Sequence, residues 1–294
     1  MRRILARAAA AALLAFAHSA AEAVERVVAV GGGVTEIVYA LGAQARLVGV
    51  DTTSLYPEAA RRLPQVGYLR ALSAEGVLSL QPDVVIADEA AGPPAALEQI
   101  ARAGVRVVRV GDGYDPDAVL RRVAGVAAAL DQEAAGAALA AALREDIGTV
   151  ERALAADSAR PGVLFLLGVG RGAPQASGRG TAADAMIRLA GGRNVVDAYQ
   201  GYRPLSAERI AALDPAIIVT TRESVEQIGG IDAVLRLPGI ALTRAAADRR
   251  IVAFDTLYLL GFGPRLAHAL RDTALALDPA RPIPSLPARR WAAP

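Results

Sequence analysis

The side chains best suited to bind a ligand are tyrosines and arginines placed at the ends of predicted elements. Tyr68 and Arg70 lie in the loop QVGYLRALSAEG, just before a predicted helix. Tyr202 and Arg203 hold the matching place before a second predicted helix, and Arg222 follows a predicted strand at its carboxyl end. Arginine is suited to bidentate recognition of carboxylates. Because ligands of open parallel sheets bind beyond the carboxyl ends of the strands, we expect these five residues to converge on one cleft.

Other chemistries have little support in the sequence. Cysteine and lysine are absent, and His268, the one histidine after residue 23, lies in an apolar helical run. This composition argues against a zinc or copper site and excludes a cysteine nucleophile. No G-x-S-x-G nucleophile, H-E-x-x-H motif or paired acidic motif occurs. The sequence therefore does not favour an enzyme.

A run of three glycines, Gly31–Gly33, follows the first predicted strand as a phosphate-binding turn would. A dinucleotide fingerprint needs a third glycine where Glu36 stands, and a phosphate loop of the Walker type needs a lysine. We therefore expect a tight turn that lets the chain approach a ligand, without a nucleotide.

Residues 1–23 are typical of an export signal. Arg2, Arg3 and Arg7 precede a short apolar core at residues 8–17, and small residues follow. Removing this segment leaves 29 arginines (32 less three) and 29 acids (30 less Glu22), so the pI near 9.2 is no argument for nucleic acid. An exported chain without cysteine fits the periplasm, and we expect a monomer.

The rest of the chain, with 53% hydrophobic and 21% charged residues, alternates predicted strands and helices. This alternation predicts a parallel sheet covered by helices. The first lobe, residues 24–115, has predicted strands at 27–30, 47–50, 84–87 and 105–110, and helices at 35–41 and 73–80. The second lobe, residues 158–294, has predicted strands at 163–167, 217–220 and 251–254, and helices at 181–190, 206–213 and 263–277. A glycine-rich loop, 168–180, is expected at the cleft edge, and the tail from 278 on the surface.

Residues 116–157 connect the two lobes in this interpretation. They have an alanine- and leucine-rich helical pattern with no proline after Pro116, and Asp115 is the expected cap. One helix of about 40 residues would span about 60 Å, too long for one small lobe. We therefore expect one long linking helix, with a possible break near Gly148.

An internal repeat supports two related lobes. The segments Leu72–Ala87 and Leu205–Thr220, LSAEGVLSLQPDVVIA and LSAERIAALDPAIIVT, share six of sixteen residues, and a Gly-Tyr pair precedes each. A loop, capped helix, proline turn and strand thus recur in register. The sequence predicts an α/β fold of two Rossmann-like lobes, joined by one long helix, with the ligand cleft between them.

Four segments resemble periplasmic haem-binding proteins of haem ABC importers: GYLRALSAEGVLSLQPDVVIA, TEIVYALGA, GRGTAADAMIRLAGGRNV and GYRPLSAERIAALDPAIIV. The resemblance covers about residues 25–277. It implies two lobes, a rigid connecting helix and haem as the transported ligand. Gly-Tyr-x-Arg before LSAEG is its most specific part: it implies that Tyr68 is the axial ligand of the haem iron. It also implies that Arg70 and a second-lobe arginine, Arg222, contact the haem or the axial tyrosine.

The chemistry agrees with this resemblance, because ferric iron is hard and accepts a phenolate oxygen. A free tyrosine has a pKa near 10, so ligation at neutral pH needs the metal's charge, helped by a nearby cation such as Arg70 or Arg222. Some related proteins carry a histidine in the glycine-rich loop of the second lobe, where it binds a second, stacked haem. Residues 168–180 contain none, so we expect one tightly held haem.

The repeat places Glu75 and Glu208 at equivalent positions, each in the first turn of its helix. An acid there stabilises the helix dipole, which is one interpretation. The resemblance implies a second: one glutamate per lobe contacts arginines of an inner-membrane ABC permease dimer, which works with its ATPase. Two alternatives to haem transport remain open, a ferric-siderophore or corrinoid carrier of the same architecture, and an α/β enzyme that uses the cleft.

Overall fold

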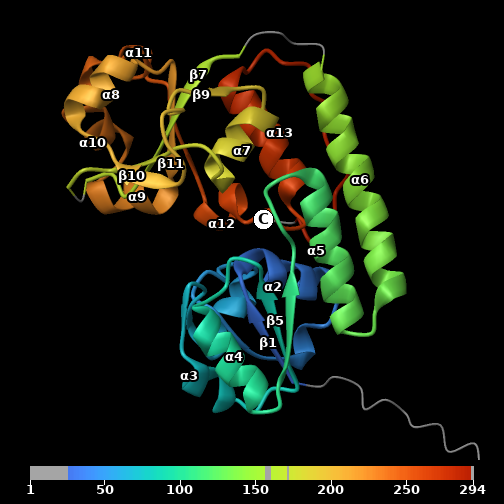
Figure 1. Ribbon diagram of the computed structural model, residues 1–294. Coiled ribbons are helices and arrows are strands. Elements are labelled where there is room, and N and C mark those ends of the chain that lie inside the picture. The colour runs from blue at the N-terminus through green and yellow to red at the C-terminus, as the bar shows by residue number, and fades with distance from the viewer. Residues whose placement is uncertain (1–25, 156–159, 171, 293–294) are drawn as a thin grey trace, which may run out of the picture.

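The computed structural model describes residues 26–155, 160–170 and 172–292; the predicted export signal lies outside these ranges. The chain forms two α/β lobes (Figure 1), as the sequence predicts. Within the described ranges, no helix combines the length and apolar character needed to cross a bilayer.

The N-terminal lobe contains a parallel sheet of order β2-β1-β5-β6. Its strands are β1 (Val27–Val30), β2 (Leu47–Val50), β5 (Val84–Asp88) and β6 (Arg106–Val110). Valine-rich β1 and β5 are central and almost entirely buried, as expected for β-branched runs between two helical layers. The helices are α2 (Gly32–Ala40), α3 (Ala74–Leu78) and α4 (Pro94–Arg102), and β3 (Gly67–Tyr68) with β4 (Ala71–Leu72) forms a small hairpin.

The C-terminal lobe has a mixed sheet of order β10-β8-β7-β11-β12, with β9 paired to β7. The strands are β7 (Gly162–Leu167), β8 (Gln175–Ser177), β9 (Arg193–Asn194), β10 (Tyr202–Pro204), β11 (Ile217–Thr221) and β12 (Ile251–Phe254). β8 is antiparallel to both β7 and β10. The helices are α7 (Ala182–Leu189), α8 (Ala207–Leu213), α9 (Arg222–Ile228), α10 (Ile231–Leu235), α11 (Arg244–Ala247), α12 (Thr256–Leu260) and α13 (Leu266–Leu277).

The prediction of one helix over residues 116–157 is wrong. The segment forms two helices, α5 (Pro116–Ala129) and α6 (Glu133–Ala155), which lie side by side in Figure 1. Asp131 takes the left-handed conformation (φ 54°), and the N–H of Gln132 closes back on the carbonyl of Ala127 at 2.9 Å, a C-terminal cap that ends α5. The expected cap at the start is confirmed, because Asp115 accepts the N–H of Ala118 at 2.7 Å. The helix runs unbroken through Gly148.

The connection between the lobes is therefore α6, whose 23 residues span about 35 Å. α5 packs on the N-terminal lobe and α6 packs on α5, close enough that a Cβ on Gly136 would overlap the side chain of Ala127. α6 also packs against α13 of the C-terminal lobe.

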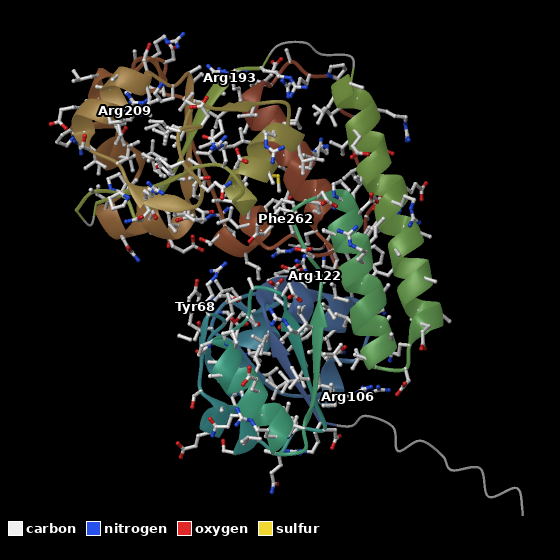
Figure 2. The ribbon with its side chains drawn as sticks, viewed as in Figure 1. Tyr68, Arg106, Arg122, Arg193, Arg209 and Phe262 are labelled. Carbon is white, nitrogen blue, oxygen red and sulfur yellow. The ribbon has the colours of Figure 1, made fainter. Side chains whose placement is uncertain are left out.

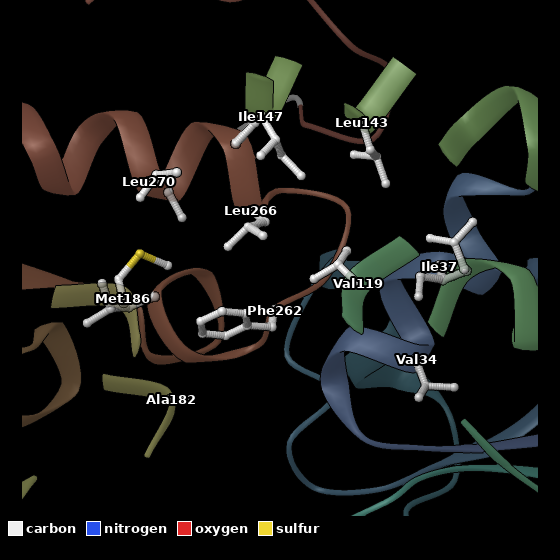
Figure 3. Packing of buried hydrophobic residues seen from close by; sticks show 14 of the residues in the cluster. Val34, Ile37, Val119, Leu143, Ile147, Ala182, Met186, Phe262, Leu266 and Leu270 are labelled. Carbon is white, nitrogen blue, oxygen red and sulfur yellow. The ribbon is translucent and has the colours of Figure 1, made fainter. Parts of the chain in front are cut away.

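One apolar core runs through both lobes. In each lobe, one face of the sheet packs in a separate cluster of buried hydrophobic residues. The opposite faces of the two sheets contribute to one shared cluster, which also includes residues of α5 and α6. Figure 3 shows Val34, Ile37 and Val119 on the N-terminal side of this shared core and Phe262, Leu266 and Met186 on the other. Because close-packed side chains resist deformation, the shared core ties the two lobes together.

The C-terminal tail contacts both lobes, which refines its predicted place on the surface. Arg281 donates to the carbonyl of Ala190 at the end of α7 (2.6 Å). Arg289 pairs with both oxygens of Asp146 on α6 (2.7 and 2.9 Å). Arg290 donates to the carbonyl of Ala40 at the end of α2 (3.3 Å).

Candidate functional site

Tyr68 and Arg70 form a direct pair on the hairpin β3–β4. Gly67 has a φ of 101°, which only glycine adopts readily, and the backbone pairs Tyr68 with Ala71 across the tight turn. The Nη1 of Arg70 donates to the Oη of Tyr68 at 2.7 Å. Tyr68 is 44% exposed, and Figure 2 shows it on the side of the N-terminal lobe that faces the other lobe. The structure thus places the hydroxyl of an exposed tyrosine beside a cation.

Arg70 has further partners that the sequence did not indicate. Its partial burial lowers the pKa, but Tyr68 and then Tyr114 and Asp88 raise it, and the net pKa lies above the usual value. Tyr114, in the loop between β6 and α5, packs edge-on against Phe262 with the ring centroids 5.3 Å apart. Arg70 therefore stays protonated among groups that stabilise its charge.

Tyr202 faces these residues from the C-terminal lobe. It lies on β10 opposite Ser177 of β8, and its ring packs edge-on against Phe165, with centroids 6.3 Å apart. Partial burial raises the pKa of Tyr202, whereas hydrogen bonds from Thr181 and the backbone of Ala183 lower it.

Two groups of the N-terminal lobe also act on Tyr202: Tyr114 raises its pKa and the charge of Arg70 lowers it. We call Tyr68, Arg70, Tyr114 and Tyr202 the tyrosine–arginine cluster. Three of its members, Tyr68, Arg70 and Tyr202, were candidates for one site in the sequence, and the structure brings them to the same interlobe region.

The other two candidate arginines lie differently. Arg203 follows Tyr202 on a strand whose neighbouring side chains alternate between faces, and its guanidinium lies 5.0 Å from the ring centre of Tyr199. The structure therefore separates Arg203 from Tyr202. Arg222 is exposed at the first position of α9, directly after β11, and Thr221 caps that helix. This is the carboxyl edge of the second sheet, as the sequence predicts.

Glu75 and Glu208 are both exposed in the first turns of α3 and α8. The capping oxygens come from serines: Ser73 accepts the N–H of Gly76 at 3.1 Å, and Ser206 accepts that of Arg209 at 3.3 Å. Glu208 also accepts hydrogen bonds from its own backbone N–H and from the Ser206 side chain, which lower its pKa, but its carboxylate remains exposed, as does that of Glu75. Figure 1 shows α3 and α8 on different lobes, on the side away from α6.

Sequence reasoning missed a buried junction between the lobes. Arg265 donates to both oxygens of Glu36, at 3.1 and 2.6 Å. Its guanidinium also lies over the ring of Tyr56 (3.8 Å to the centroid) and over that of Tyr258 (5.1 Å). The side chains of Arg265 and Glu36 are only 11% and 4% exposed. Burial raises the pKa of Glu36, and the hydrogen bonds and charge of Arg265 act against that shift.

The glycine run Gly31–Gly33 belongs to the same junction. The sequence predicts that this run approaches a ligand, but Gly33 approaches the backbone of the other lobe. A Cβ on Gly33 would stand 2.5 Å from the carbonyl oxygen of Gly261 in the other lobe. Nearby, buried Arg122 bonds the carbonyl of Phe262 at 2.7 Å and pairs with Asp88 at 3.1 Å. We call these contacts, together with Glu36–Arg265, the interlobe junction.

No group of three or more histidine, cysteine, aspartate or glutamate side chains that could hold a metal ion occurs among the residues described.

Comparisons with known proteins identify relatives that match most of the chain. The family model described as periplasmic binding protein matches residues 27–257. The structure of the periplasmic haem-binding protein BhuT in complex with two haems is 44% identical, with a TM-score of 0.81, over 86% of this chain and 97% of that one. The haem-binding protein RhuT from Roseiflexus sp. RS-1, in apo form, is 42% identical, with a TM-score of 0.82, over 88% and 99%. The vitamin B12-binding protein of Yersinia pseudotuberculosis is 28% identical over 76% and 80%.

The family match covers most of the chain and includes residues of both lobes. The members of this family bind substrates and are not enzymes. The chain belongs to the periplasmic binding protein family.

Proposed function

We propose that the chain captures ferric haem between its lobes, with Tyr68 as the axial iron ligand, and delivers it to an inner-membrane ABC permease. The observation that carries this proposal is the bond of 2.7 Å from Arg70 to the exposed Tyr68 oxygen. A phenolate accepts such a charge-assisted bond and still has lone pairs for iron. The similarity to haem-binding structures supports haem in particular.

The second lobe completes the binding surface in this proposal. Tyr202 lies opposite Arg70 and offers an aromatic ring, 38% exposed, to the flat macrocycle. In this proposal Arg222, exposed at the carboxyl edge of the second sheet, binds a propionate carboxylate. Arg203 stacks on Tyr199, so we assign it an indirect role.

Delivery requires a second surface. Glu75 and Glu208 each project from one lobe on repeated helices, and a pair related by pseudo-symmetry suits a dimeric permease. The proposal places the chain in the periplasm, exported by residues 1–23.

The ligand class is tested by titrating the mature protein with haemin, iron-free protoporphyrin and cyanocobalamin. Haem capture predicts a saturable change of the Soret band with haemin and much weaker binding of the iron-free ring, which cannot bond to Tyr68. Tight binding of cyanocobalamin without a haemin response would instead assign the corrinoid alternative.

The number of haems is a separate question. BhuT was solved with two haems, whereas residues 168–180 of this chain contain no histidine. We therefore expect one tightly held haem, and native mass spectrometry at low haem excess tests this. Mainly two-haem protein would contradict it.

A further inference from the structure

The C-terminal lobe contains a hollow of about 540 Å³, whose lining shares no residue with the tyrosine–arginine cluster. Four arginines from four segments line it: Arg160 before β7, Arg179 in the glycine-rich loop, Arg188 on α7 and Arg193 on β9. Figure 2 shows Arg193 on the end of this lobe away from the N-terminal lobe. We call this site the arginine hollow.

The charges in the arginine hollow are not balanced. Two acids line it, Asp184 and Asp197. Asp184 already has partners: one of its oxygens accepts from Asn194 (3.1 Å), and the other accepts from Arg188 (3.3 Å) and from the N–H of Gly180 (3.2 Å). Within the described part of the chain, the guanidinium groups of Arg179 and Arg193 have no hydrogen-bond or ion-pair partner. Four positive groups against two negative ones favour an anion.

Backbone hydrogen bonds hold the main chain of the two unpaired arginines in place. The N–H of Arg179 donates to the carbonyl of Tyr199 at 2.8 Å, and the N–H of Gly201 donates back to Arg179 at 3.1 Å. The N–H of Arg193 donates to the carbonyl of Pro161 at 2.9 Å. Donors on a fixed backbone lose less conformational entropy when they bind a ligand than donors on a free loop.

A buried polar network forms the base of the hollow. Asp184 and Asn194 are only 5% and 7% exposed. Asn194 also donates to the carbonyl of Ser177 at 3.0 Å, and Thr181 shares a hydrogen bond with the Ser177 hydroxyl. Satisfied polar groups at such depth define one geometry, which an accidental groove between solvated arginines lacks.

The sequence run GRGTAADAMIRLAGGRNV supplies most of this lining. We propose that the arginine hollow binds a phosphoryl group, carried by a small soluble molecule or by a lipid headgroup. A tetrahedral phosphoryl group presents oxygens in several directions, which suits arginines approaching from four segments, whereas a planar carboxylate presents two in one plane.

The test uses the full mature protein and inorganic pyrophosphate in isothermal titration calorimetry. We expect saturable one-to-one binding. In R179Q/R193Q it should weaken by a factor of about ten or more, because two charge-assisted contacts are lost. Neither side chain has a structural partner, so the variant should fold, which thermal melting checks. The matched control is R209Q, an exposed arginine on α8 outside the hollow, which should bind pyrophosphate normally.

A second arm identifies the carrier. Sedimentation with phosphatidylglycerol vesicles that pyrophosphate and R179Q/R193Q both abolish would assign a lipid headgroup, and pyrophosphate binding without sedimentation would assign a soluble molecule. No saturable binding in either arm, or an equal loss in R209Q, would overturn the proposal. Haemin binding is measured in parallel and should be unchanged in R179Q/R193Q, so failure of this site is distinguishable from failure of the proposed haem site.

Discussion

The tyrosine–arginine cluster and the interlobe junction both join residues of the two lobes, but they differ in solvent exposure and in bonding. In the cluster, Tyr68 and Tyr202 are 44% and 38% exposed. In the junction, Glu36 and Arg265 are buried and form two direct hydrogen bonds. We infer from this contrast that the buried junction holds the lobes together, and we propose that the more exposed cluster contacts the ligand.

The largest expected effect is on the junction. In R265M, Glu36 is left buried without its partner, and we expect a loss of about 3–5 kcal/mol in the free energy of unfolding. The matched control is R249M, which removes an ion pair with Asp232 whose side chains are both 67% exposed; it should cost at most about 1 kcal/mol. Equal denaturant midpoints for the two variants would show that the junction does not hold the lobes.

Removal of the exposed Arg70 side chain tests the tyrosine–arginine cluster and should leave the fold unchanged. In R70A the Tyr68 oxygen loses its hydrogen bond, and because such outer contacts of a metal ligand are worth about 10–100-fold in affinity, haemin should bind weaker by that factor. R203A is the matched control, since Arg203 stacks on Tyr199 away from Tyr202. Haemin titration of both variants is the measurement, and similar losses would place Arg203 in the site after all.

The smallest effect on binding is expected at the two helices of the repeat. E75A/E208A leaves the serine caps intact, so haemin affinity should not change and stability should change by less than about 1 kcal/mol. Docking predicts impaired haem uptake and weaker stimulation of the permease ATPase in reconstituted vesicles. Normal uptake by this variant would leave the glutamates only their helix-dipole role.

Local pattern was enough to predict the lobes. Buried valine and isoleucine runs define β1, β5 and β11, a buried run rich in leucine defines β7, and serine or threonine caps define the starts of α3, α7 and α8. The end of α5 was missed because Asp131, not a glycine, takes the left-handed conformation between two alanine-rich segments. The short strands β8, β9 and β10 have two or three residues each, too few to show an alternating pattern.

The candidate site was predictable only where one segment contains the whole interaction. Tyr68 and Arg70 are two residues apart, and their bond follows from the hairpin. Glu36 and Arg265 are 229 residues apart, and no local signal links them. Tyr114 joins the cluster because α5 and β6 carry its loop toward the other lobe, which depends on tertiary packing alone.

The most direct test of the central claim is the absorption spectrum of the haemin-loaded protein in the matched pair Y68F and Y202F. The account predicts that Y68F loses the phenolate-to-iron charge-transfer band and binds haemin at least about 100-fold weaker, since the ligand itself should matter no less than its outer contacts. Y202F should retain the band, because the Tyr202 oxygen that this substitution removes is bonded to Thr181 and to the backbone of Ala183. An unchanged band in Y68F, or its loss in Y202F alone, would contradict the assignment of Tyr68 as the iron ligand.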